Sequence, residues 1–105
     1  MTSSSARLDE FRLAIDELDR KIVALLAERT RVVRTLTELK RDEETVRSRD
    51  RVEQVIAKVR GLAEQNGMPP DIVEATYRTL IEELTRLQLE RLAERRRSGA
   101  LDQAP

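Results

Sequence analysis

Two basic residues in the first half of the chain have the type and spacing of an anion-binding pair. Arg29 stands between Leu25 and Val32 in an otherwise apolar helical stripe. A cation there must be solvated, paired or bound to an anion, because an isolated buried charge is very costly. Lys40 follows 11 residues later, which on a continuous helix is about 16 Å along the axis and about 20° around it. We therefore expect the two side chains to point the same way and to close on a small dianion.

The stripe that contains Arg29 predicts one long helix. Its apolar members recur at alternating steps of three and four residues, the period of a helical seam. They are Leu8, Phe11, Ile15, Leu18, Ile22, Leu25, Val32, Leu36 and Leu39. We expect this helix to run from about Leu8 to Lys40 or Arg41, a length of about 50 Å at 1.5 Å per residue.

Two further helices are expected after a short polar connection at residues 42–45. The second helix begins near Ser48, which is a suitable N-cap, and ends at Asn66-Gly67, a typical helix stop. Its apolar stripe consists of Val52, Val55, Ile56, Val59, Leu62 and Ala63. The third helix opens at Pro69-Pro70 and reaches toward Arg91.

Three helices of this kind cannot cover a seam of about 50 Å. The uncovered half would expose a larger apolar stripe than a monomer normally tolerates. The pattern therefore predicts an all-α fold of three helices, one of them very long, in an intertwined, domain-swapped homodimer.

Composition supports a single helical domain and excludes several kinds of chemistry. The chain has 105 residues, of which 38% are charged and only two are aromatic, and such a composition favours long charged helices over a β-fold. We expect a disordered segment at residues 1–7, a helical domain at 8–94 and a flexible tail at 95–105. The last of these contains Arg95-Arg96-Arg97, a basic run of the kind that is usually a solvated helix end.

Charge and missing residue types narrow the function further. Acidic and basic residues balance at 20 each, which disfavours a nucleic-acid partner. Without cysteine or histidine the chain lacks a thiol nucleophile and the commonest metal ligand and general base, so we expect no metal and no cofactor. The sequence shows no signal peptide or membrane-spanning segment, and we expect a cytoplasmic protein without a membrane partner.

Three more residues stand out as candidate ligands. Arg51 lies in the first turn of the second helix, Gln88 places an amide on the apolar face of the third, and Arg12 flanks the seam. Each alone has a simpler interpretation. Arg12 and Arg51 could be solvated surface charges, Arg29 could pair with an acid across a dimer, Lys40 could stabilise a helix C-terminus, and Gln88 could be an edge residue. Their occurrence together favours a binding site.

The order and spacing of these residues resemble the all-helical (AroQ) class of chorismate mutases. The resemblance covers about residues 8–92. It rests on Phe-Arg-x-x-Ile-Asp-x-Leu-Asp at 11–19, Leu-Leu-Ala-Glu-Arg at 25–29, Lys40, Arg51-Val52 and Ile-x-Glu-x-x-x-x-Gln at 81–88. It implies a domain-swapped helical dimer with two sites and a small dicarboxylate substrate.

The resemblance also implies roles for individual residues. Arg29, with Arg12 from the partner chain, would bind the two substrate carboxylates. Lys40 and Gln88 would donate to the ether oxygen, and Arg51 would lie near the ring. A [3,3] rearrangement of an enolpyruvyl ether needs a folded substrate and donors at the breaking C–O bond, but no nucleophile, base or metal. About 8 kcal/mol would account for a millionfold acceleration.

Three positions depart from the usual family pattern. Acidic residues that contact the 4-hydroxyl of the ring are common where Ser48 and Val52 fall, and a small hydroxyl residue is common where Leu84 falls. Val52 cannot hydrogen-bond a hydroxyl group. We therefore favour 4-amino-4-deoxychorismate as the substrate, in a pathway toward p-aminophenylalanine-type antibiotic precursors.

Three alternatives remain open at this point. The chain could rearrange chorismate to prephenate for aromatic amino-acid synthesis. It could be an isochorismate-pyruvate lyase, since a valine after the Arg51-type arginine also occurs in lyases. It could instead be a non-catalytic coiled-coil adaptor that uses the seam only for association.

Overall fold

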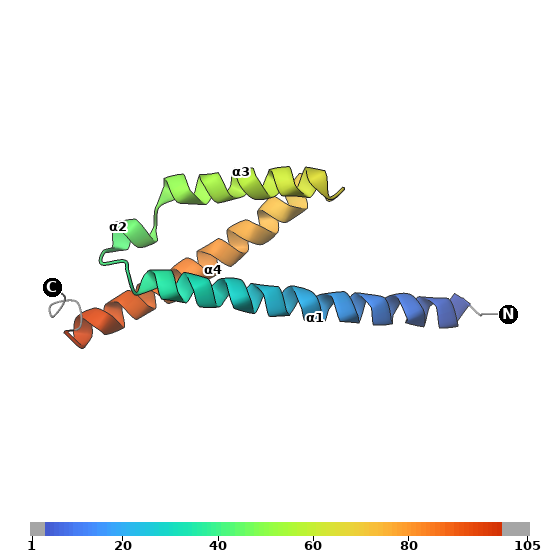
Figure 1. Cartoon of the computed structure of the whole chain (residues 1–105), viewed down its shortest axis with the longest axis horizontal. Helices are drawn as coiled ribbons and strands as arrows, with labels where there is room; N and C mark the ends of the chain where they lie inside the picture. The colour runs from blue at the N-terminus through green and yellow to red at the C-terminus, as the bar shows by residue number, and fades with distance from the viewer. Residues whose placement is uncertain (1–3, 100–105) are drawn as a thin grey trace. The chain divides into compact units, whose positions relative to one another are not determined.

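The computed structural model describes residues 4–99 and consists of helices and their connections (Figure 1). The elements are α1 (Ser4–Thr37), α2 (Glu43–Val46), α3 (Arg49–Gln65) and α4 (Pro70–Arg97). No strand occurs within residues 4–99, so the predicted all-α fold with three long helices is confirmed. The chain divides into two units, one up to Val33 and one from Arg34 onward. None of the helices described at residues 4–99 is long and apolar enough to cross a membrane.

The first unit is a single stretch of helix α1 with an exposed apolar seam. The exposed fractions of Phe11, Ile22 and Leu25 are 61%, 52% and 62%. The helix begins at Ser4, four residues before the predicted start at Leu8, so residues 4–7 of the segment expected to be disordered are helical. Residues 1–3 lie outside the described part of the chain.

The second unit is built around helices α3 and α4, which pack against each other and are joined by a tight turn (Figure 1). Gly67 adopts a φ of +68°, in the left-handed region that favours glycine. The Met68 amide donates to the Ala63 carbonyl at 2.8 Å and the Gly67 amide to Glu64 at 3.3 Å, the two bonds of a Schellman motif. The predicted helix stop at Asn66-Gly67 is confirmed.

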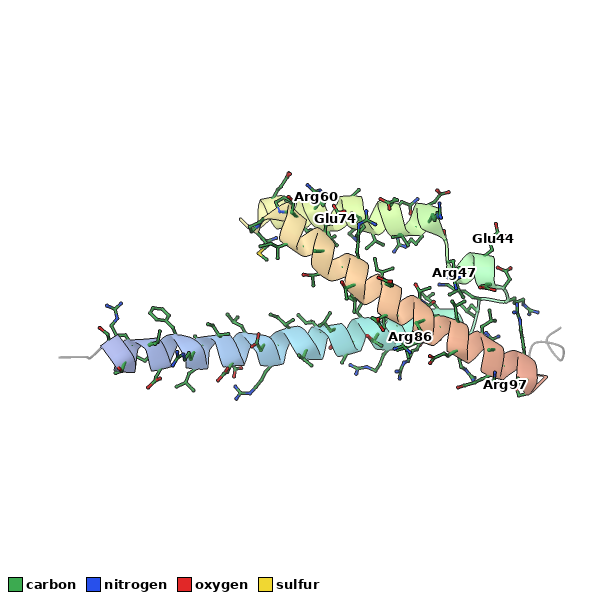
Figure 2. All side chains as sticks on the ribbon, turned by 180° about the vertical axis from the view of Figure 1, so that it is seen from behind. Glu44, Arg47, Arg60, Glu74, Arg86 and Arg97 are labelled. Carbon is green, nitrogen blue, oxygen red and sulfur yellow. The ribbon has the colours of Figure 1, made fainter. Side chains whose placement is uncertain are left out.

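The apolar core of this unit comes from α2, α3 and α4. Its buried apolar side chains are Val46, Ile56, Val59, Ala63, Leu84 and Leu92. Ion pairs reinforce the packing at the surface: Arg60 of α3 donates to Glu74 of α4 at 2.8 Å (Figure 2). The hydrogen bonds from Arg78 and Arg60 hold the pKa of the Glu74 carboxyl below its ordinary value.

Helix α1 ends earlier than predicted. Its last residue is Thr37, and the next three amides, of Glu38, Leu39 and Lys40, each bond to the carbonyl three residues before them. This tightening is a common way to close a helix. Lys40 therefore lies outside α1, and the helical register that we assumed between Arg29 and Lys40 is wrong.

Residues 42–48 also form more structure than the predicted polar connection. Asp42 caps the one-turn helix α2, because its carboxylate accepts from the Thr45 amide at 2.7 Å. This backbone hydrogen bond lowers the pKa of Asp42. Ser48 then caps α3, as predicted, by accepting from the Arg51 amide at 3.3 Å.

Helix α4 continues to Arg97, beyond the expected end near Arg91 and into the segment predicted as a flexible tail. Arg95 is only 8% exposed, so this part of the basic run is not a solvated helix end. The rest of the predicted tail from residue 100 onward lies outside the described residues.

Candidate functional site

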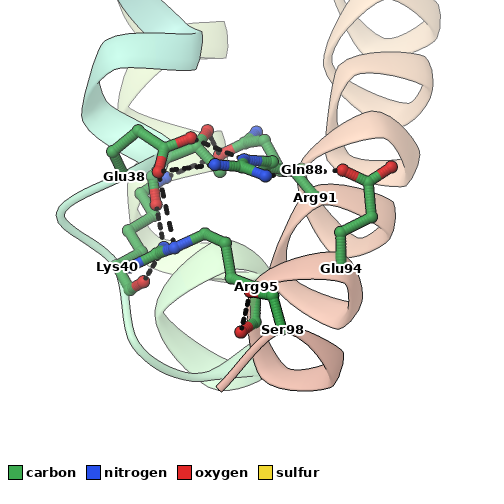
Figure 3. Close-up of polar contacts among 8 residues, drawn as sticks. Glu38, Lys40, Gln88, Arg91, Glu94, Arg95 and Ser98 are labelled. Carbon is green, nitrogen blue, oxygen red and sulfur yellow. Dashed lines mark hydrogen bonds and ion pairs between the residues drawn. The ribbon is translucent and has the colours of Figure 1, made fainter. Parts of the chain in front are cut away.

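Two residues singled out from the sequence, Lys40 and Gln88, meet in the second unit. The Lys40 ammonium donates to Gln88 Oε1 at 2.9 Å (Figure 3). Thr37 Oγ1 donates to the same oxygen at 3.1 Å. Gln88 is 9% exposed on the apolar face of α4, between Leu84 and Leu92, which confirms that this face carries an amide. The three side chains form a partly buried polar centre, which we call the Lys40–Gln88 centre.

The hydrogen bonds fix the orientation of the Gln88 amide. An ammonium group can only donate, so the atom of Gln88 that faces Lys40 must be the oxygen. The amide nitrogen is thereby left to donate to another acceptor. Lys40 also has three N–H groups, of which Gln88 engages one. The centre can therefore present an amide and an ammonium donor to a single oxygen atom.

The pKa of Lys40 is lowered from its ordinary value. The main cause is burial, which penalises the charged form, and the second is the positive charge of Arg51. Arg51 thus acts electrostatically on Lys40, although it is exposed in the first turn of α3. The two cations repel each other, and an anion bound near both would relieve that repulsion.

A group of charged side chains surrounds the Lys40–Gln88 centre at the end of α4 (Figure 3). Arg91 binds Glu38 with two hydrogen bonds, at 2.7 Å from Nε and 3.3 Å from Nη2. This contact lowers the pKa of Glu38. Arg95 Nε lies 3.4 Å from the Glu38 carboxylate, and its Nη1 donates to the carbonyls of Thr37 and Lys40 at 3.0 and 2.9 Å. Side chains of α4 thus hold the segment that follows α1.

The predicted ring-contacting residues lie at the start of α3. The Ser48 hydroxyl is engaged as the helix cap. Val52 is half-buried and lines an open groove of about 790 Å³. The apolar lining of the groove is completed by three residues of α4, Ile81, Leu89 and Ala93. Arginine and glutamate side chains border the groove. Lys40 and Gln88 are not among the lining residues in the described chain.

The other predicted site residues have different surroundings. Leu84 is 8% exposed and belongs to the α3–α4 core. Arg12 and Arg29 belong to the unit that ends at Val33. Arg12 is exposed, with Nη1 at 3.8 Å from the Asp9 carboxylate, and Arg29 is half-buried on α1. The structure thus joins Lys40 with Gln88 and Ser48 with Arg51.

Sequence reasoning missed three contributors to this centre: Thr37, Glu38 and Arg95. A periodicity search could have found Arg95, because Leu84, Gln88, Leu92 and Arg95 recur at steps of four, four and three on one helix face. No comparable sequence signal marks Thr37 or Glu38, because the contacts of both residues depend on where α1 ends. Within residues 4–99 no group of three or more acidic, histidine or cysteine side chains is placed to hold a metal ion.

Comparison with known proteins gives one match. A family model described as chorismate mutase type II matches residues 11–89, which is most of the chain. Neither the curated proteins nor the solved structures include one that matches.

Proposed function

Since the chain belongs to the chorismate mutase type II family, it is an isomerase of the type that catalyses a Claisen rearrangement, and we propose that its substrate is 4-amino-4-deoxychorismate. The product would be 4-amino-4-deoxyprephenate. The observation that carries the choice of substrate is the absence of an acidic side chain at Ser48 and Val52, at the start of α3. Ser48 offers only a neutral hydroxyl, whose oxygen accepts from the Arg51 amide, and Val52 has no polar atom to offer a 4-hydroxyl.

The Lys40–Gln88 centre supports the proposed chemistry. In a [3,3] rearrangement the C–O bond of the enolpyruvyl ether breaks while a C–C bond forms, and negative charge gathers on the ether oxygen. An ammonium and an amide N–H fixed at one place can stabilise that charge without reorganising during the reaction. The 2.9 Å contact between Lys40 and Gln88 holds both donors close together.

Arginine side chains would bind the two substrate carboxylates. Guanidinium groups bind carboxylates through two parallel hydrogen bonds, which fixes the orientation of a flexible substrate. We assign this role to Arg29 and to Arg12 of a second copy. Arg51 would lie near the ring, and its repulsion of Lys40 would be relieved by the bound dianion.

The contribution of Arg12 from a second copy requires a homodimer. The exposed seam of α1 supports this part of the proposal, because Phe11, Ile22 and Leu25 each leave more than half of their surface uncovered. Exposed apolar area of this extent usually marks an interface. Seams of two long helices would cover each other in an intertwined pair.

Binding of the amine requires no acidic partner if the amine is neutral. Lys40 and Arg51 make this region cationic, and a second ammonium group would be repelled. We therefore expect kcat/KM for the amino substrate to increase as the pH rises through the pKa of the substrate's amine.

A turnover assay with three substrates tests the proposal. The purified protein would be given 4-amino-4-deoxychorismate, chorismate or isochorismate, and products would be identified by mass spectrometry and NMR. The proposal requires the amino compound to be rearranged well above chorismate. A preference for chorismate would place the enzyme in aromatic amino-acid synthesis, and release of pyruvate from isochorismate would identify a lyase. Failure to convert any of the three would favour the coiled-coil adaptor.

A further inference from the structure

Arg95 is a buried cation that makes an unusual set of contacts at the end of α4. Its side chain is 10% exposed. One nitrogen, Nη1, donates both to the Thr37 carbonyl at 3.0 Å and to the Lys40 carbonyl at 2.9 Å. The carboxylate of Glu38 lies 3.4 Å from Nε and compensates the buried charge. The Arg95 carbonyl in turn accepts from Ser98 at 3.0 Å.

The two backbone carbonyls that Arg95 holds belong to the two residues that hold Gln88. Thr37 and Lys40 donate their side chains to Gln88 Oε1, at 3.1 and 2.9 Å. Arg95 and Gln88 both lie on α4, seven residues apart. Helix α4 therefore binds the segment of residues 37–40 twice (Figure 3). Arg95 binds the backbone of that segment, and Gln88 binds its side chains.

We propose that Arg95 is a positioning residue that keeps the Lys40 ammonium beside the Gln88 amide. This inference rests on the proposed function, because it assigns to Arg95 the placement of the two donors that face the ether oxygen. Lys40 lies beyond the last residue of α1, so the helix alone does not set its position. Arg95 adds two hydrogen bonds from its guanidinium group to the carbonyls of Thr37 and Lys40.

Three variants separate positioning from charge and from general stability. Arg95→Met keeps an apolar stem of similar size but removes the guanidinium group. Arg95→Lys keeps the charge without the planar array of donors. Arg97→Met is the matched control, because Arg97 lies in the same last turn of α4 and is exposed.

Kinetics on the folded protein gives the first test. Misplacing a catalytic group by about 1 Å can cost roughly a hundredfold in rate. For Arg95→Met we expect kcat per folded active site to fall roughly tenfold to a hundredfold, with little change in KM, because the carboxylate-binding arginines remain. Arg95→Lys should recover part of the loss, and Arg97→Met should match the wild type. An unchanged kcat in folded Arg95→Met would overturn the proposal.

The pKa of Lys40 gives a second test that needs no substrate. It would be measured by NMR on protein with isotope-labelled lysine. The charged groups near Lys40 are Arg51 from α3, Arg95 from α4 and Glu38 from the segment after α1. If Arg95 holds Lys40 in its partly buried place, the lowered pKa should rise toward its ordinary value in Arg95→Met and also in Arg95→Lys, where the charge is kept.

The two tests distinguish the possible failures. A wild-type protein that converts none of the three substrates refutes the proposed function, while the Lys40 titration still judges the role of Arg95. A pKa of Lys40 that is the same in Arg95→Lys and the wild type overturns the positioning role. If Arg95→Met does not fold, Arg95→Lys decides both tests.

Discussion

The two units of this chain arrange apolar and polar residues in opposite ways. In residues 4–33 the seam side chains of α1 are exposed. In residues 34–99 helices α3 and α4 pack an apolar core between them, and polar groups are enclosed with it: Thr37, Gln88 and Arg95 are 2%, 9% and 8% exposed. These three residues are hydrogen-bonded to one another: the Thr37 hydroxyl donates to Gln88, and Arg95 donates to the Thr37 carbonyl.

The difference shows where each unit gets its stability. The second unit buries an apolar core of its own, and its buried polar side chains are hydrogen-bonded within the described residues. A single exposed helix has little stability of its own, because most helical stability in proteins comes from packing of an apolar face. We therefore expect the first unit to depend on association and the second to depend on its internal network.

The largest effect should come from a charge in the seam of the first unit. An uncompensated buried charge costs about 3–5 kcal/mol, and a symmetric dimer would carry the substitution twice. Ile22→Lys should therefore convert the proposed dimer to monomer in analytical ultracentrifugation. Val23→Lys is the matched control, because Val23 is the adjacent residue and lies off the seam. A wild-type protein that is monomeric at micromolar concentration would contradict the dimer itself.

Removal of the proposed substrate-binding cations should have the next largest effect. Lys40→Ala and Arg29→Ala should each lower kcat/KM by roughly a hundredfold to a thousandfold, since loss of one preorganised donor costs about 3–4 kcal/mol. Circular dichroism should show unchanged helix content. Lys58→Ala, an exposed lysine on α3, should have no effect on rate. Rates near the wild type in both variants would refute the site assignment.

A smaller effect is expected from an acid at the start of α3. Val52→Glu should raise the preference for chorismate over its 4-amino analogue by roughly tenfold to a hundredfold, because a hydrogen bond to a charged group contributes about 1.5–3 kcal/mol. Ala57→Glu adds the same charge at an exposed position of α3 and should leave the ratio unchanged. Competition between the two substrates in one reaction measures the ratio directly. An unaltered ratio in Val52→Glu would mean that this helix face does not contact position four of the ring.

The smallest expected effect is a shift in the pH profile. Lys40 must be protonated to donate, so kcat/KM should fall as the pH rises through its pKa, which is lowered by burial and by Arg51. The alkaline limb should therefore lie below the ordinary lysine value of about 10.5. Lys40→Arg should move that limb upward, since arginine stays protonated. If the alkaline limb does not move in Lys40→Arg, the limb reports the titration of another group.

Much of the second unit could be predicted because its signals are local. Ser48 is a helix cap, Gly67 takes a left-handed conformation and the α3 stripe follows the helical period, so each residue's own chemistry indicates its structure. The amide expected on the apolar face of α4 is that of Gln88, which the structure places at 9% exposure between Leu84 and Leu92. The end of α1 was mispredicted, because the apolar seam continues to Leu39 and gives no stop signal.

The sequence by itself determined the helical class, the three long helices, the apolar seam and the family to which the chain belongs. These properties depend on periodicity, caps and the order of a few residues, all of which are local or additive along the chain. Only the tertiary structure decided that α1 ends at Thr37 and that Arg95 is buried against the segment that follows. The reason is that the carbonyls at the end of α1 are bonded by a guanidinium group more than fifty residues away, and no local pattern encodes such a contact.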